Sequence, residues 1–178
     1  MKPTKVLTLI LIAAATTPLA WLASTLMVLR GLPSPVSQLN ISFTLVVAGL
    51  LILGLSVPIY RYRSELTKLS KAAASGTAIN PAGAPPKRPK RVDPFYAVRV
   101  LVLSKAISFT SVLFIGWHAG VVISQLAAPV VPAGVWKNVL ALVASGFALA
   151  AALVVERICR LPDDGAASAG AATDASPA

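Results

Sequence analysis

The chain has 178 residues, of which 56% are hydrophobic and 12% are charged, and its mean hydropathy is +0.78. Soluble domains have about 45 to 50% apolar and about 25% charged residues, so this composition indicates an integral membrane protein. A membrane-spanning helix needs about 20 apolar residues, and the apolar runs predict four such helices with no separate soluble domain. The single cysteine, Cys159, and the single histidine, His118, exclude an internal disulfide and a multi-histidine metal site.

The first apolar run, over about residues 6–28, follows Lys2 and Lys5. A positive start before an apolar run is typical of a signal peptide and also of a first membrane helix. The apolar region of a signal peptide has only about 7 to 15 residues, so the length of this run predicts a membrane helix. A second, uncharged span is predicted over about residues 39–60.

A basic segment over about residues 61–93 follows the second span. Tyr62, Leu66 and Leu69 recur at helical spacing near its start, so we expect the second helix to continue as a short amphipathic piece that lies on the membrane surface. After Gly76 the segment is rich in Pro, Gly and Ala and predicts a disordered linker. The basic residues of this linker, Lys87, Arg88, Lys90 and Arg91, are expected to attract anionic lipid headgroups. No aromatic residue lies among these four to stack on nucleobases, which argues against nucleic-acid binding.

The distribution of basic residues predicts the orientation of the chain. The segment over 61–93 contains eight lysines and arginines, whereas the other two connections contain only Arg30 and Lys137. Basic loops stay on the cytoplasmic side, so we expect this linker and both termini to be cytoplasmic, in a plasma-membrane protein. The membrane domain covers residues 1–162, and the small and polar residues over 163–178 predict a disordered cytoplasmic tail.

The third span, over about residues 97–125, is the most polar of the four. At 100° per residue, Lys105 lies near the line of a predicted helix-packing seam, which consists of Ser108, Gly116 and Gly120. Its best acidic partner is Glu156, at the inner end of the fourth span over about residues 135–156. Two interpretations stay open: an inner-leaflet ion pair of Lys105 and Glu156, with Arg99 nearby, or a Lys105 side chain that extends back to the interface.

His118 projects from another face of the third span, which it shares with Ser111 and Gln125. This outer-leaflet polar face has either a structural role, with His118 bonded to a neighbouring helix or to water, or a proton-handling role. No carboxylate is placed to orient the imidazole, and no base accompanies the serines as it would a nucleophile. We therefore predict no catalytic, cofactor-binding or metal-binding residues.

Three stretches resemble the actinobacterial membrane-protein family known as domain of unknown function 3180. They are the opening MKPTK, the third-span entry DPFYAVRVLVLSKAISF and the closing VVERICRLP. The resemblance implies a four-span plasma-membrane protein and no established activity. Lys105, Glu156, Arg157 and Cys159 carry over only as positions of these motifs.

The predicted fold is thus all-α: a bundle of four transmembrane helices with both termini cytoplasmic. Our first functional hypothesis is a non-enzymatic scaffold or accessory subunit that packs through small-residue helix faces. Its expected partners are the lipid bilayer, anionic headgroups, and a membrane protein or a second copy of the chain. The alternative is a small oligomeric transporter or channel that uses Lys105 and Glu156.

Overall fold

The structure is a computed structural model that describes residues 5–74 and 93–159. Within these ranges the chain forms four helices and no strand: α1 (Val6–Leu29), α2 (Leu39–Ala74), α3 (Pro94–Leu126) and α4 (Val135–Cys159). Each helix is long and apolar enough to cross a membrane. This confirms the predicted all-helical, four-span fold. The linker predicted after Gly76, up to residue 92, and the tail predicted over 163–178 lie outside the described residues.

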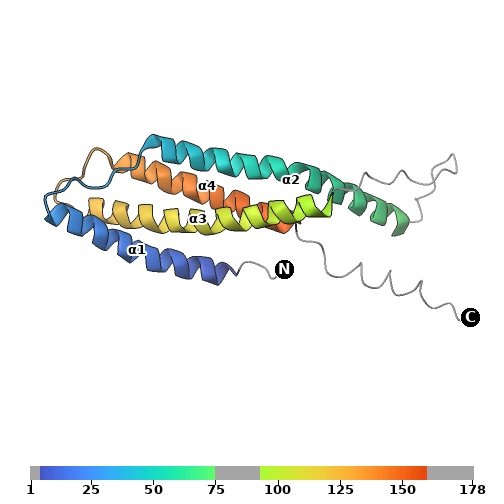
Figure 1. The fold of residues 1–178 in the computed structure, drawn as a ribbon, viewed down its shortest axis with the longest axis horizontal. Helices are drawn as coiled ribbons and strands as arrows, with labels where there is room; N and C mark the ends of the chain where they lie inside the picture. The colour runs from blue at the N-terminus through green and yellow to red at the C-terminus, as the bar shows by residue number, and fades with distance from the viewer. Residues whose placement is uncertain (1–4, 75–92, 160–178) are drawn as a thin grey trace, which may run out of the picture.

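The four helices lie lengthwise beside one another in the order α1, α3, α4, α2 (Figure 1). Helix α3 packs along α1 on one side and along α4 on the other, and it also touches α2. Helix α2 packs mainly on α4, whereas α1 comes close to neither α2 nor α4. The third span is therefore the one helix that contacts the other three. Helix α1 is attached to the rest of the bundle through α3 alone.

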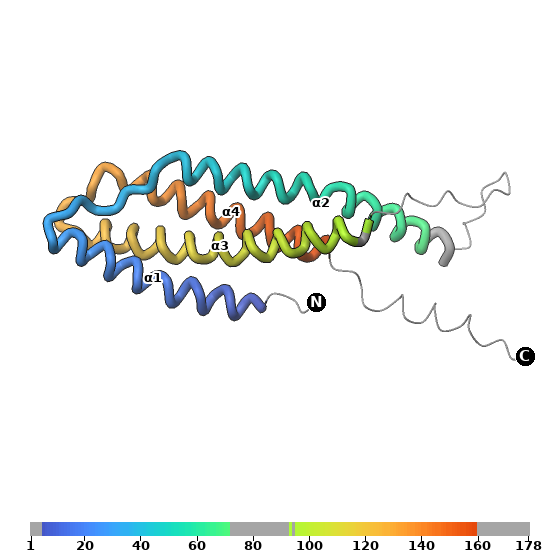
Figure 2. Tube along the Cα trace, in the orientation of Figure 1, coloured from blue at the N-terminus to red at the C-terminus, as the bar shows by residue number. Residues whose placement is uncertain are grey.

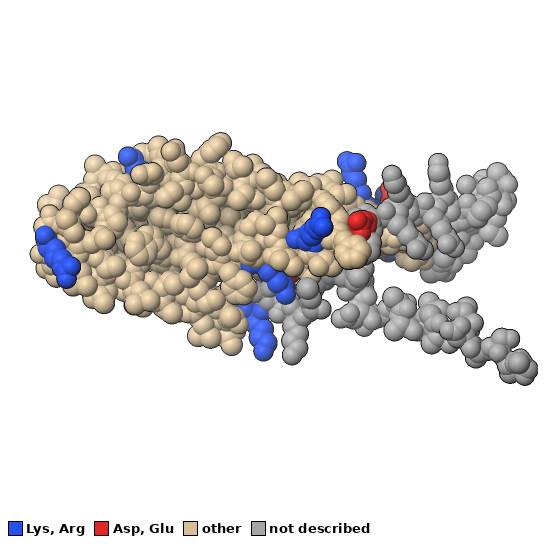
Figure 3. Space-filling model, in the orientation of Figure 1, with Lys and Arg blue, Asp and Glu red and all other residues tan. Residues whose placement is uncertain are grey.

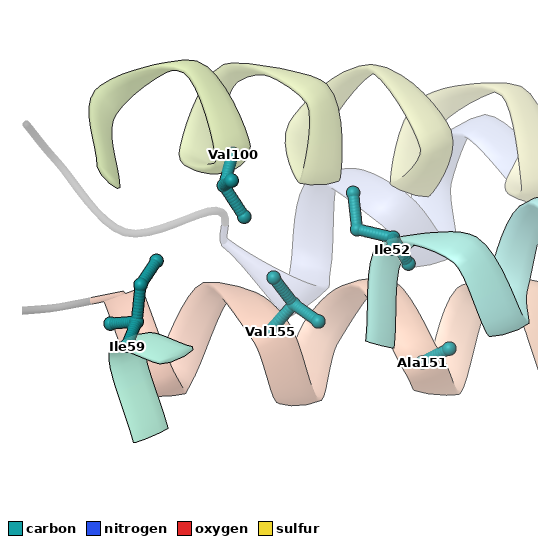
Figure 4. Packing of buried hydrophobic residues seen from close by; sticks show 5 residues of the cluster. All are labelled: Ile52, Ile59, Val100, Ala151 and Val155. Atoms are coloured by element: carbon teal, nitrogen blue, oxygen red, sulfur yellow. The ribbon is translucent and has the colours of Figure 1, made fainter. Parts of the chain in front are cut away.

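The apolar core lies where α2, α3 and α4 meet, near the end of the bundle from which α2 projects (Figure 4). Five buried side chains form it: Ile52, Ile59, Val100, Ala151 and Val155. Most of the other buried residues of α4 are alanines, together with Ser145. Small side chains let two helices approach α4 closely, and this explains how α2 and α3 both pack against it.

Helix α2 continues beyond the predicted span over residues 39–60. It runs through Pro58 without interruption to Ala74, and its last part continues in nearly the same direction beyond the ends of α3 and α4 (Figures 1 and 2). The segment over 61–74 is thus a continuation of the second helix, as we expected from the sequence, and it keeps nearly the direction of the span. One reason is Arg63, whose Nη1 donates hydrogen bonds of 2.6 and 3.1 Å to the Ile158 and Arg157 carbonyls. These bonds tie the extension to the end of α4.

The start of α3 follows the local sequence closely. The Asp93 side chain accepts a hydrogen bond of 2.9 Å from the Phe95 amide, and Pro94 occupies the first helical turn. A carboxylate at the N-cap and a proline in the first turn are both favourable, because the first amides of a helix have no partner within it. This cap fixes the residue at which the third span begins.

Candidate functional site

The two glycines of the predicted seam lie directly against α1. A Cβ atom added to Gly120 would lie 2.7 Å from the Ala20 Cβ and 2.8 Å from the Trp21 amide nitrogen. One added to Gly116 would overlap the hydroxyl of Thr16. Both positions require glycine because the backbones of α1 and α3 approach too closely for any side chain. This part of the seam is therefore occupied within the chain, and its partner is α1.

Serines of α3 make hydrogen bonds both within α3 and to α1. Ser108, the third residue of the predicted seam, is fully buried, and its hydroxyl donates a hydrogen bond of 2.9 Å to the Ser104 carbonyl. Near the other end of the helix, the Ser124 hydroxyl donates a hydrogen bond of 2.9 Å to the Ser24 hydroxyl of α1. These groups satisfy their hydrogen bonds locally, as packing residues do.

A buried amide network joins α3, α4 and the connection between α1 and α2 at the end of the bundle opposite the extension of α2. Asn138 donates through Nδ2 to the Gln125 Oε1 at 3.0 Å and to the Pro35 carbonyl at 3.1 Å. Its Oδ1 accepts a hydrogen bond of 2.9 Å from the Ser37 amide. Gln125 also donates to the Pro35 carbonyl, at 3.1 Å. The network holds a loop and two helix ends in one arrangement.

Asn138 had no place in our predictions, although it makes more of these bonds than any residue we predicted. A weak signal was present in the sequence. Asn138 is an uncharged amide just inside the fourth span, as Gln125 is just inside the third. Two amides at the same predicted depth on consecutive spans are a pattern expected of an interhelical hydrogen bond.

His118 lines a pocket of about 320 Å³ beside this network. The His118 side chain is 3% exposed, its ring stacks on Phe114 with centroids 6.0 Å apart, and neither ring nitrogen bonds to a described residue. Ser111 is also buried, and its hydroxyl likewise bonds to no described residue. The predicted polar face is thus divided: Gln125 belongs to the amide network, His118 borders the pocket, and Ser111 is buried in the helix packing.

The predicted inner-leaflet charges occupy three different environments. Glu156 is buried, with 3% of its surface exposed, whereas Lys105 is half-buried and Arg99 is exposed. Both Lys105 and Glu156 have an interaction partner. The burial of Glu156 is notable because an ionised carboxylate in an apolar environment requires compensation. Arg99, by contrast, lies on the surface and is not part of a buried cluster.

Within residues 5–74 and 93–159, no group of three or more His, Cys, Asp or Glu side chains is arranged to hold a metal ion. The family of proteins of unknown function designated DUF3180 matches residues 9–163 of the chain. The chain belongs to the DUF3180 family. This match covers the four helices almost entirely and confirms the resemblance seen in the sequence. No curated protein and no solved structure matches the chain.

Proposed function

We propose that this member of the DUF3180 family is a non-enzymatic membrane scaffold or accessory subunit that binds a membrane protein or a second copy of itself. The observation that carries the proposal is the position of α1. This helix packs on α3 alone, and only Leu9, Ala20 and Ser24 of its residues are buried. Most of its surface remains available to lipid or to another helix.

The exposed surface of α1 is uncharged and rich in large apolar side chains. It includes large apolar side chains such as Leu11, Trp21 and Leu22, and no charged residue lies between Val6 and Leu29. Association between membrane helices depends on van der Waals packing and on interhelical hydrogen bonds rather than on the hydrophobic effect. A helix fixed along one side and apolar on the others supports lateral association in the bilayer.

The proposal includes an orientation and a location. Lys and Arg side chains gather toward the right-hand end in Figure 3, where the extension of α2 and the start of α3 lie. The opposite end carries Arg30 and Lys137. By the positive-inside rule, the more basic end faces the cytoplasm of a plasma-membrane protein, with both termini on that side.

Photocrosslinking in native membranes tests the scaffold proposal. A photoreactive amino acid is placed at Leu11 or Leu22 of α1, which are 61% and 49% exposed, and at Leu50 of α2, which is 56% exposed, as a matched control. We expect discrete protein adducts from the two α1 positions and mainly lipid adducts from Leu50. Lipid adducts alone from all three positions would contradict the proposal.

A transporter or channel is the second candidate, and the burial of Glu156 is the observation that favours it. A buried ionisable group in a membrane segment is a candidate for an ion or proton pathway, and Glu156 is buried. Lys105 is its proposed partner. In reconstituted vesicles, Lys105→Met is then expected to abolish flux, whereas Arg99→Met, at an exposed site, leaves it intact. Equal flux in both variants would remove Lys105 from any transport mechanism.

A further inference from the structure

A basic pocket of about 510 Å³ lies between the extension of α2 and the last turns of α4. It is separate from the helix contacts on which the scaffold proposal rests. Its walls come from two helices far apart in the sequence: Tyr60, Arg63, Ser64, Thr67, Lys68 and Lys71 from α2, and Val154, Arg157 and Ile158 from α4. The pocket exists because α2 continues in nearly the same direction beyond Tyr60. If the helix turned away at Tyr60, its basic residues would not lie beside the last turns of α4.

The pocket carries a strong positive charge. Four of its lining residues are lysines or arginines, and no carboxylate of a described residue lines it. Of the three hydroxyls in the lining, those of Ser64 and Thr67 donate to the Arg61 and Arg63 carbonyls at 2.8 and 2.9 Å. The basic side chains and the Tyr60 hydroxyl are therefore the groups that can donate to an anion in this pocket.

Arg63 gives the pocket a fixed geometry. Its Nη1 donates to the last carbonyls of α4, at Arg157 and Ile158, and so places a guanidinium at the negative end of the α4 dipole. The half-buried Arg63 thereby connects the two walls. Arg157 of α4 and Lys68 of α2, which are both exposed, line the same pocket.

The remaining walls are apolar and belong to the membrane-spanning part of the chain. Tyr60 is the last residue of α2 before the first basic residue, Arg61, and Val154 and Ile158 are on the last turns of α4. The pocket therefore lies at the level where the hydrocarbon core meets the headgroups. Bases beside apolar walls at that depth match the phosphate and the upper acyl chain of one lipid molecule.

We propose that this pocket binds the phosphate-bearing headgroup of an anionic phospholipid, with Lys68 and Arg157 as the main contacts to the phosphate. The apolar wall favours a lipid over a soluble phosphate compound, because a soluble ligand would leave Tyr60, Val154 and Ile158 without a contact. Lipid binding here would anchor the extension of α2 to the membrane surface and stabilise its contact with α4.

Native mass spectrometry of the full-length protein tests the proposal. The protein is taken from nanodiscs containing phosphatidylcholine and a minor fraction of phosphatidylglycerol, and the lipids that remain bound are counted. We expect preferential retention of phosphatidylglycerol by the wild type and a decrease of roughly 30-fold in its apparent affinity for K68Q/R157Q. The control is R61Q/R99Q, which removes the same charge from exposed residues that do not line the pocket.

Two results would overturn the proposal. The first is an equal loss of phosphatidylglycerol in K68Q/R157Q and in R61Q/R99Q, which would indicate general surface attraction rather than a site. The second is displacement of phosphatidylglycerol by inorganic phosphate or soluble glycerol phosphate at similar concentrations, which would identify a soluble anion as the ligand. Binding of phosphatidylglycerol in the wild type and the control, but not in K68Q/R157Q, supports the proposal whatever the photocrosslinking of α1 shows.

Discussion

The side-chain amide of Asn138 donates a hydrogen bond of 3.0 Å to the side-chain oxygen of Gln125, and this bond joins the first turn of α4 to the last turn of α3. Because Asn138 also bonds Pro35 and Ser37, its replacement leaves several buried polar groups unpaired at once. We expect Asn138→Leu to lower the free energy of unfolding by about 2 kcal/mol, measured by thermal denaturation in detergent.

Asn40 provides the matched control for this substitution. It lies in the first turn of α2 and its side chain is exposed, so Asn40→Leu is expected to change stability by less than about 0.5 kcal/mol. Equal stability of the two variants would show that the amide network does not hold this end of the bundle together.

The close approach of α1 and α3 predicts that Gly120→Ala weakens their packing. The added methyl group would lie 2.7 Å from the Ala20 Cβ and 2.8 Å from the Trp21 backbone, so the two helices must separate. Overpacking of this kind costs about 1 to 3 kcal/mol. We expect a lower melting temperature and weaker disulfide crosslinking between cysteines introduced in α1 and α3.

Gly54 and Gly146 lie in helices with open space at their Cβ positions. Alanine at either position should therefore be neutral or stabilising, by up to about 1 kcal/mol, through its higher helix propensity. If Gly54→Ala were as destabilising as Gly120→Ala, the loss at Gly120 would have to be attributed to something other than its contact with α1.

The hydrogen bonds of Arg63 predict that its loss frays the end of α4. In Arg63→Met the carbonyls of Arg157 and Ile158 lose their side-chain donor, and the end of the α4 dipole loses a nearby positive charge. We expect faster amide hydrogen exchange in the last turns of α4 and a loss of about 1 kcal/mol in stability. Arg61→Met removes an exposed neighbour outside these bonds and is expected to leave that exchange unchanged.

The predicted ion pair between Lys105 and Glu156 can be tested by a double-mutant cycle. If they interact directly, the losses of stability in Lys105→Met and Glu156→Gln are non-additive by about 0.5 to 3 kcal/mol. Arg99→Met combined with Glu156→Gln serves as the comparison, since Arg99 is exposed. Additive losses for Lys105 and Glu156 would mean that each interacts with a different partner.

Our prediction that Gly116 and Gly120 lie on a packing face rested on spacing alone, and the structure shows which helix meets them. Spacing could not have named α1, because every other span is apolar and offers small residues of its own. Asn138 illustrates the opposite case. It lies beside Trp136 and Lys137 in the sequence, and its importance depends on Gln125 and on the Pro35–Ser37 loop, which reach it only in the folded bundle.

For the basic residues after Tyr60, too, one part could be predicted from the sequence and another part depends on the fold. Their charge and their position at the end of a span are visible in the sequence and predict contact with anionic headgroups. The pocket that they form with Arg157 depends on α2 continuing as a straight helix beside α4, and on Arg63 bonding to the end of α4. A local pattern of bases and apolar residues does not contain that information.

By itself, the sequence determined the number of membrane-length helices and the difference in basic charge between the two ends of the spans, because hydrophobic length and flanking bases act locally on each segment. The tertiary structure alone decided that α1 packs only on α3, that α2 packs mainly on α4 rather than on α3, and that Asn138 joins three segments. The physical reason is that helix surfaces facing lipid and those facing protein are both apolar in a membrane. Hydropathy therefore locates the spans but does not distinguish their neighbours, which shape and buried hydrogen bonds determine.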